Sequence, residues 1–129
     1  PLAVELQQRA DLMRLRDRVS FMGWVNKEDL WPRVDLLLMP SLHEGAPNAV
    51  LEALAFNLPV LASDIPEHRE ILPASNLMAL DDHSLWVERI RRIAQSPEQQ
   101  IEKLVADQRL YVDQLIFDWD QLICSYILG

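Results

Sequence analysis

Hydrophobic and polar positions along the first part of the chain predict a helix followed by short strands. Leucines at helical spacing among Gln and Arg predict an amphipathic helix over residues 2–15. The apolar run Val19–Met22, which a glycine closes, is typical of a strand. A single helical turn is expected over 27–31. The continuous apolar run 35–39, which ends at a proline, is typical of a strand covered on both faces.

The same alternation continues beyond the loop at 41–46. Pro47 suits the first residue of a helix, and residues 49–56 are apolar nearly all round, which predicts a buried helix. We expect the next strand at Val60–Ala62 and a short helix over 65–72.

The remainder of the chain is predicted to be mainly helical. A last strand is expected over 76–80, and helices follow from His83, with breaks near Ser96-Pro97 and around 113–118. Strands that alternate with helices indicate an α/β fold, a Rossmann-like three-layer domain with a mostly parallel sheet and a helical C-terminus. Since three or four strands are few for such a sheet, we expect residues 1–129 to be a single partial domain whose first strands lie upstream.

Composition narrows the function classes. The chain has 129 residues, half of them hydrophobic, which excludes global disorder. A net charge of -8 without a basic cluster argues against a nucleic-acid partner, and no apolar run is long enough to span a bilayer. The single cysteine, Cys124, excludes an internal disulfide framework and is expected in the core. A reducing, cytoplasmic location is expected.

The loop between Met39 and Pro47 is the most distinctive place for chemistry. In open α/β sheets, ligands bind beyond the carboxyl ends of the strands. This loop contains His43, Glu44 and Gly45 and leads into the N-terminus of the predicted buried helix. Unpaired N–H groups and the helix dipole attract phosphate there, and a glycine lets a ligand approach the main chain.

Two glutamates lie on either side of this helix start. Glu44 precedes the helix and Glu52 lies inside it. Carboxylates repel phosphate but accept paired hydrogen bonds from sugar hydroxyls, so the pair suggests a ligand with sugar, phosphate and sugar in sequence. Because acidic pairs at this spacing also arise by chance, an ordinary solvated residue remains the alternative for Glu52. The apolar surroundings of Glu52 favour the functional interpretation.

One long segment carries a family resemblance. Residues 35–63 resemble the signature of retaining GT-B glycosyltransferases of family 4, and 19–25 and 117–120 with Tyr126 extend the likeness. The central motif is His43-Glu44-Gly45-Ala46-Pro47-Asn48-Ala49-Val50-Leu51-Glu52, which leads on to Pro59-Val60-Leu61-Ala62-Ser63. The resemblance implies the C-terminal half of a GT-B fold, here a truncated, donor-binding domain.

The resemblance also implies an activity and residue roles. Family members transfer a sugar from a nucleoside diphosphate to a saccharide or lipid-linked acceptor with retention, usually without a metal or other cofactor. The family's two glutamates, separated by seven residues, match Glu44, which would face the donor sugar as the catalytic residue, and Glu52, which would take the ribose hydroxyls. Backbone N–H groups from Ala46 to Leu51 would hold sugar hydroxyls and diphosphate, and Val25 and Lys27 would border the nucleobase. The implied donor-binding set is Gly45, Ala46, Pro47, Asn48, Ala49, Val50, Leu51, Glu52, Val25 and Lys27.

The chain departs from the family pattern at several places. Ala46 stands where a bulky residue is frequent, which enlarges the space near the sugar, and Phe56-Asn57 replaces a frequent Cys-Gly at the helix end. The resemblance places the family's phosphate-binding Arg and Lys, and the N-terminal acceptor domain, upstream of Pro1. We therefore expect a half-site without turnover of its own. Polysaccharide biosynthesis, and peripheral association of the full-length enzyme with the inner face of the membrane, fit the family.

Two alternatives remain open at this point. One is a GT-B relative that epimerises a nucleotide sugar at C2. The other is a non-catalytic assembly module in which helices over 83–128 form a partner surface, and an exposed sheet edge would also favour a homo-oligomer of the fragment.

Other reactive residues have simpler interpretations. His43 is expected as a hydrogen-bonded loop residue, and His68 and His83 as surface residues. No His or Cys pair has ligand spacing, so no metal site is expected. A Ser-His-Asp triad could be drawn from Ser63, His68 and Asp64, but no nucleophile elbow surrounds any serine. Arg69 would approach the donor only if its helix abuts the site. The aromatic residues expected in the core are Trp31, Trp86, Trp119 and Tyr126.

Overall fold

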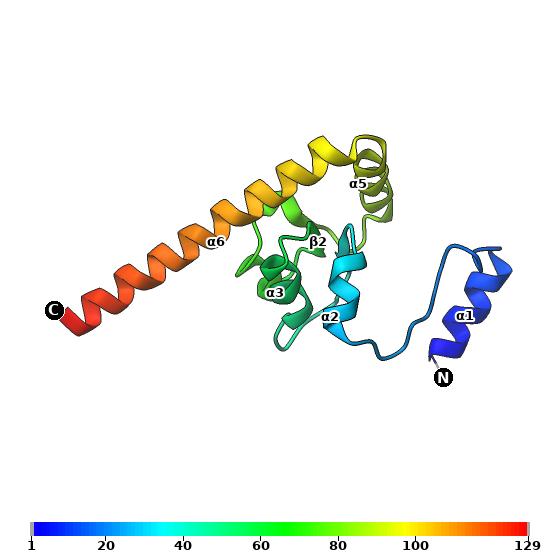
Figure 1. The fold of residues 1–129 in the computed structure, drawn as a ribbon, viewed down its shortest axis with the longest axis horizontal. Coiled ribbons are helices and arrows are strands. Elements are labelled where there is room, and N and C mark those ends of the chain that lie inside the picture. The colour runs from blue at the N-terminus through cyan, green and yellow to red at the C-terminus, as the bar shows by residue number, and fades with distance from the viewer. Residues whose placement is uncertain (1, 129) are drawn as a thin grey trace. The chain divides into compact units, whose positions relative to one another are not determined.

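The structure, a computed structural model, describes residues 2–128, with side chains from 2 to 118. The chain forms two compact units, Pro1–Arg33 and Val34–Gly129, which are described separately (Figure 1). The side chains of Trp119, Asp120, Cys124 and Tyr126 lie outside the described residues, and the expectations for them stay predictions.

The first unit contains short helices. These are α1 (Leu2–Leu12), α2 (Lys27–Leu30) and the 3-10 helix η1 (Trp31–Arg33). The predicted first helix is confirmed but ends at Leu12, because Arg14 adopts a left-handed conformation with φ 57°. Asn26 caps α2 by accepting a hydrogen bond from the Glu28 backbone N–H at 3.1 Å.

The strand expected at Val19–Met22 is wrong. Residues 19–22 have no strand conformation in the structure, and Phe21 and Met22 are about half exposed. Apolar, β-branched residues favour a strand only when a neighbouring strand satisfies their backbone groups, and the described residues of this unit form no such neighbour.

The second unit is built on a parallel sheet of three strands in the order β1-β2-β3. The strands are β1 (Leu37–Met39), β2 (Val60–Ser63) and β3 (Leu77–Met78), and Leu37 pairs with Val60 while Ala62 pairs with Leu77. Helix α3 (Asn48–Ala55) joins β1 to β2. Helix α4 (Pro66–Arg69) and the 3-10 helix η2 (Ala74–Asn76) join β2 to β3. The predicted α/β class with a parallel sheet is confirmed.

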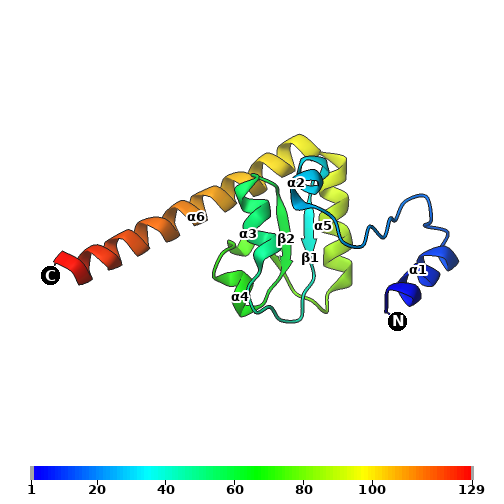
Figure 2. The same ribbon diagram turned by 60° about the horizontal axis from the view of Figure 1, so that its bottom comes forward.

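Two helices follow the sheet, α5 (His83–Gln95) and α6 (Pro97–Leu128). Figure 2 shows α3 to one side of β1 and β2 and α5 to the other, which gives the expected helix–sheet–helix layers. On the α5 side, Leu61 of β2 belongs to a buried cluster whose other members are Met78, Trp86, Ile93 and Leu104. All four residues of β2 are buried, as expected for the central strand of a covered parallel sheet.

Side-chain amides of Asn76 and Gln108 pair with the start of β2, ahead of the residues that β3 pairs with. Oε1 of Gln108, in α6, accepts a hydrogen bond from the Val60 N–H at 2.8 Å, and Nε2 of Gln108 donates one to the Leu58 carbonyl at 3.0 Å. Asn76 donates to the Val60 carbonyl at 2.7 Å and to Gln108 Oε1 at 2.7 Å. Both amides are buried, so they replace ladder hydrogen bonds at the start of β2.

Helix α3 differs from its prediction at its N-terminus and on one face. Pro47 is the residue that caps the helix rather than its first residue. Val50 and Ala53 are buried, but Leu51 is 46% and Phe56 49% exposed, so the helix is not buried all round. Asn57 ends it in a left-handed conformation, φ 56°, which asparagine adopts more readily than most other non-glycine residues.

The break predicted within residues 113–118 is also wrong, because α6 continues without interruption to Leu128. Residues 98–128 contain neither Pro nor Gly, so nothing in the backbone stops the helix. The break near Ser96-Pro97 is confirmed. Figure 1 shows the C-terminal half of α6 extending beyond the sheet.

Within the described part of the chain, no helix is both long and apolar enough to cross a membrane.

Candidate functional site

Glu44 is held in the loop between β1 and α3 by hydroxyl groups. The Ser41 hydroxyl donates to Glu44 Oε1 at 2.5 Å, and Glu44 is half-buried. The Ser63 hydroxyl, at the end of β2, donates to the Ser41 carbonyl oxygen at 2.6 Å. The loop that carries Glu44 is therefore tied to the carboxyl end of the central strand, where ligands of open parallel sheets bind.

The start of α3 offers few unpaired N–H groups. Asn48 donates to the Ala46 carbonyl at 2.8 Å, and Val50 and Leu51 donate to that of Pro47 at 3.0 and 3.1 Å. Proline has no N–H, so of the groups predicted from Ala46 to Leu51 only those of Ala46 and Ala49 have no hydrogen-bond partner among the described residues. The start of α3 therefore offers fewer N–H groups to an anion than predicted.

Gly45 and Glu52 lie on either side of this helix start. A Cβ at Gly45 would meet no atom within 4 Å, so the surrounding fold does not itself require a glycine there. Glu52 is half-buried and lies one helical turn after Asn48, on the same face of α3 as Asn48. It takes part in an interaction within the structure, so it is not an isolated surface carboxylate. His43 is exposed.

The other two predicted residues, Val25 and Lys27, belong to the first unit. Val25 is half-buried and Lys27, the first residue of α2, is exposed. Their predicted position beside a nucleobase stays a prediction.

His68 lies beside Ser63 at the end of β2 and is fully buried, which corrects its expected surface position. Its Nδ1 lies 2.8 Å from the Ser63 carbonyl oxygen and 3.4 Å from the Ser63 hydroxyl. Its Nε2 is buried without a partner among the described residues. Polar neighbours in the sequence suggested exposure, but α4 turns the ring toward the end of β2. His83, at the start of α5, is exposed as expected.

The structure does not bring together a Ser-His-Asp triad. Asp64 pairs with Arg69 at 2.6 Å instead of contacting His68. The hydrogen bond from Arg69 lowers the pKa of the Asp64 carboxyl, with a smaller contribution from the Arg69 charge. Since Arg69 is occupied by this exposed ion pair, its predicted approach to a donor has no support here. Trp31 and Trp86 are buried, as predicted.

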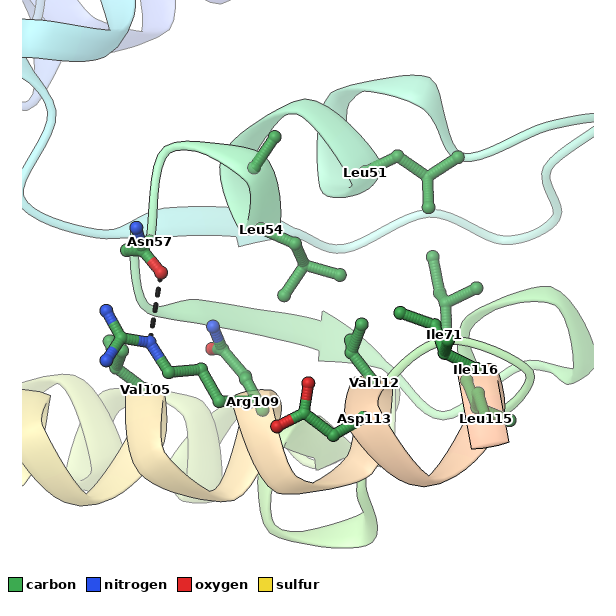
Figure 3. Close-up of a pocket in the computed structure, with 12 residues that line it drawn as sticks. Leu51, Leu54, Asn57, Ile71, Val105, Arg109, Val112, Asp113, Leu115 and Ile116 are labelled. Carbon is green, nitrogen blue, oxygen red and sulfur yellow. Dashed lines mark hydrogen bonds between the residues drawn. The ribbon is translucent and has the colours of Figure 1, made fainter. Parts of the chain in front are cut away.

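A separate apolar groove of about 470 Å³ lies between α3 and α6. Figure 3 shows Leu51 and Leu54 on one side of it, and Val112 on the other. At one end Arg109 donates to Asn57 Oδ1 at 3.0 Å. Leu51 is the only one of the predicted site residues that lines the groove. Its apolar lining does not suit a diphosphate, so this groove is distinct from the candidate site.

The described residues contain no candidate metal site. In the part of the chain that the structure describes, no group of three or more His, Cys, Asp or Glu residues is placed to hold a metal ion. Metal-independent chemistry remains an expectation.

The serines of the site were missed by sequence reasoning. Ser41 precedes Glu44 by three residues, a spacing compatible with a local side-chain contact. Ser63 lies 22 residues from Ser41, and no local pattern connects them.

Comparison with known proteins places this site in context. Residues 1–96 match the family described as glycosyl transferases group 1. The chain is 35% identical over 100 residues to the O-antigen chain mannosyltransferase RfbU of Salmonella typhimurium, covering 74% of this chain and 28% of that protein. It is 34% identical over 98 residues to the putative glycosyltransferase EpsF of Bacillus subtilis, covering 73% and 26%. The chain thus spans about a quarter of the length of these relatives.

A further relative and a solved structure are also similar to this chain. Over 54 residues the chain is 39% identical to an Escherichia coli UDP-Gal:alpha-D-GlcNAc-diphosphoundecaprenol alpha-1,3-galactosyltransferase, covering 41% of this chain and 14% of that protein. The fold is similar to sucrose-phosphate synthase from Thermosynechococcus elongatus, with a TM-score of 0.63 and 21% identity, over 93% of this chain and 34% of that structure. At this identity the likeness concerns the fold alone.

Proposed function

Because the chain belongs to the glycosyl transferases group 1 family, we propose that residues 41–52 bind a nucleoside diphosphate sugar, the donor for retaining transfer to a saccharide or lipid-linked acceptor. The observation that carries the proposal is the loop before α3, in which Glu44 is fixed by a hydrogen bond from Ser41. Glu52 follows on the same helix start.

The chemistry of this segment suits the parts of such a donor. The unpaired N–H groups of Ala46 and Ala49, with the positive end of the α3 dipole, would attract the diphosphate. Glu44 and Glu52 are repelled by the phosphates and instead accept hydrogen bonds from hydroxyl groups. Glu44 would meet the transferred sugar and Glu52 the ribose.

The reaction itself needs no nucleophile from this segment. The bond between the anomeric carbon and the diphosphate oxygen breaks, and the acceptor oxygen bonds to that carbon on the same face. The acceptor proton passes to the departing diphosphate, whose charge the helix start would stabilise. The relatives named above are transferases, which supports transfer rather than epimerisation. We propose that a domain outside this chain binds the acceptor.

The experiment is a calorimetric titration of the chain with UDP, GDP and ADP. We expect one nucleotide to bind best, and Glu52→Ala to weaken it about tenfold or more, because a hydrogen bond to a charged group contributes roughly 1.5–3 kcal/mol. Glu102→Ala, at an exposed position of α6, is the matched control and should bind like the wild type. No binding at millimolar nucleotide, or wild-type affinity in Glu52→Ala, would refute the proposal and favour an assembly module.

A further inference from the structure

Two serine hydroxyls connect Glu44 to the sheet. Ser41 donates to Glu44 Oε1 at 2.5 Å, at the short end for a hydroxyl bound to a carboxylate. Ser63 donates to the Ser41 carbonyl at 2.6 Å and lies 3.4 Å from that of Met39. Glu44 is thus linked through two hydrogen bonds to the end of β2.

The far end of this connection is buried and hydrogen-bonded. Ser63 is fully buried, and the backbone N–H of the next residue, Asp64, donates to the Met78 carbonyl at 2.8 Å. His68, also fully buried, lies with Nδ1 2.8 Å from the Ser63 carbonyl. A side chain anchored in this way keeps its conformation, whereas a loop glutamate without such contacts would sample several rotamers.

The arrangement has a specific consequence for a ligand. Ser41 occupies Oε1 of Glu44, while Oε2 makes no hydrogen bond to the described residues. A carboxylate held through one oxygen presents the other in a defined direction, as preorganised binding requires.

We propose that Ser41 is a positioning residue: it orients Glu44 so that Oε2 accepts a hydrogen bond from a hydroxyl of the donor sugar, with Ser63 fixing Ser41 from the sheet. This inference rests on the proposed function. It predicts that Ser41 affects recognition of the sugar and not recognition of the nucleotide. A serine that served stability alone would affect both or neither.

The experiment compares nucleotide and nucleotide-sugar binding in the same variants. The affinities of the chain for UDP and UDP-galactose, and for GDP and GDP-mannose, are measured for the wild type, Ser41→Ala, Ser41→Thr and Glu44→Gln. The readout is the ratio of the Kd of the nucleotide to that of its sugar conjugate. We expect Ser41→Ala to lower this ratio about three- to tenfold, because Glu44 keeps its carboxylate but loses its orientation and so only part of its hydrogen bond to the sugar, with the nucleotide Kd unchanged.

Two further variants separate orientation from folding. Ser41→Thr retains the hydroxyl and should keep the wild-type ratio. Ser96→Ala removes an exposed serine between α5 and α6 and should change neither Kd. Circular dichroism verifies that each variant folds. If Ser41→Ala does not fold, it is replaced by Ser41→Cys, whose thiol is only a weak hydrogen-bond donor and which should likewise lower the ratio.

The outcomes distinguish the two proposals. If Glu44→Gln lowers the ratio and Ser41→Ala does not, the positioning role is refuted while the proposed function stands. A Ser41→Ala variant that weakens nucleotide and nucleotide sugar equally also refutes it. If Glu44→Gln leaves the ratio unchanged, or no nucleotide binds, the proposed function itself fails.

Discussion

Gln108→Leu tests the interpretation that side-chain amides complete the central sheet. Gln108 is 2% exposed, and its amide makes three hydrogen bonds. The leucine side chain has a similar size but can neither donate nor accept a hydrogen bond. The substitution therefore leaves the Val60 N–H and one N–H of Asn76 buried without partners, next to a β2 that is fully buried.

The expected cost follows from these two donors. Each buried group that loses its partner costs about 1–3 kcal/mol, and burial of the leucine side chain offsets part of the sum. We expect the free energy of unfolding to fall by about 2–4 kcal/mol, a large fraction of the stability of a small domain. With a typical urea dependence of about 2 kcal/mol per M, the midpoint should fall by about 1–2 M.

The assay is urea denaturation followed by far-UV circular dichroism. Gln99→Leu, at an exposed position of the same helix, is the matched control and should stay within about 0.5 kcal/mol of the wild type. Equal midpoints for Gln108→Leu and Gln99→Leu would show that the amides do not stabilise the sheet, and the reasoning would be refuted.

Two further predictions concern the core and a helix cap. Leu61→Ala should lower the free energy of unfolding by about 2–5 kcal/mol in the same assay, whereas Leu110→Ala, at a position 70% exposed, should change it little; equal effects would contradict the assigned core. Asp82 accepts hydrogen bonds from Ser84 Oγ and the Leu85 N–H, which lower the pKa of its carboxyl. The stabilisation that the Asp82 carboxylate gives the folded state is complete above about pH 4 and is lost as the pH falls through this lowered pKa. The difference in Tm between wild type and Asp82→Asn should therefore shrink in acid. A difference that grows in acid would contradict the reasoning.

The sheet was predictable because its strands are defined locally. Continuous apolar runs between chain-breaking residues predict parallel strands, and β1 and β2 lie where those runs lie. Only β2 is fully buried, and the expectation that β1 is covered on both faces is wrong because Leu38 is 40% exposed. The run Val19–Met22 has the same appearance but no neighbouring strand, and pairing is a long-range property that a single run does not contain. The exposure of α3 has a similar cause. Apolar content predicts burial, but part of that helix lines an open groove.

The candidate site was predictable in position but not in detail. The rule that ligands bind beyond the carboxyl ends of parallel strands is sufficient to identify the loop before α3. Which N–H groups remain unpaired depends on the path of the loop, since Asn48 and Val50 donate to nearby carbonyls. The contact between Ser41 and Ser63 depends on bringing two strand ends together.

The most direct test of the central proposal is to map nucleotide binding by 1H–15N NMR. The assigned chain is titrated with UDP, GDP and ADP, and the amide shifts are followed residue by residue. We expect the largest shifts at Gly45, Ala46 and Ala49, with little change in the α6 residues that line the apolar groove. Shifts centred on Val112 and Ile116, or no shifts at millimolar nucleotide, would contradict a donor site at the start of α3.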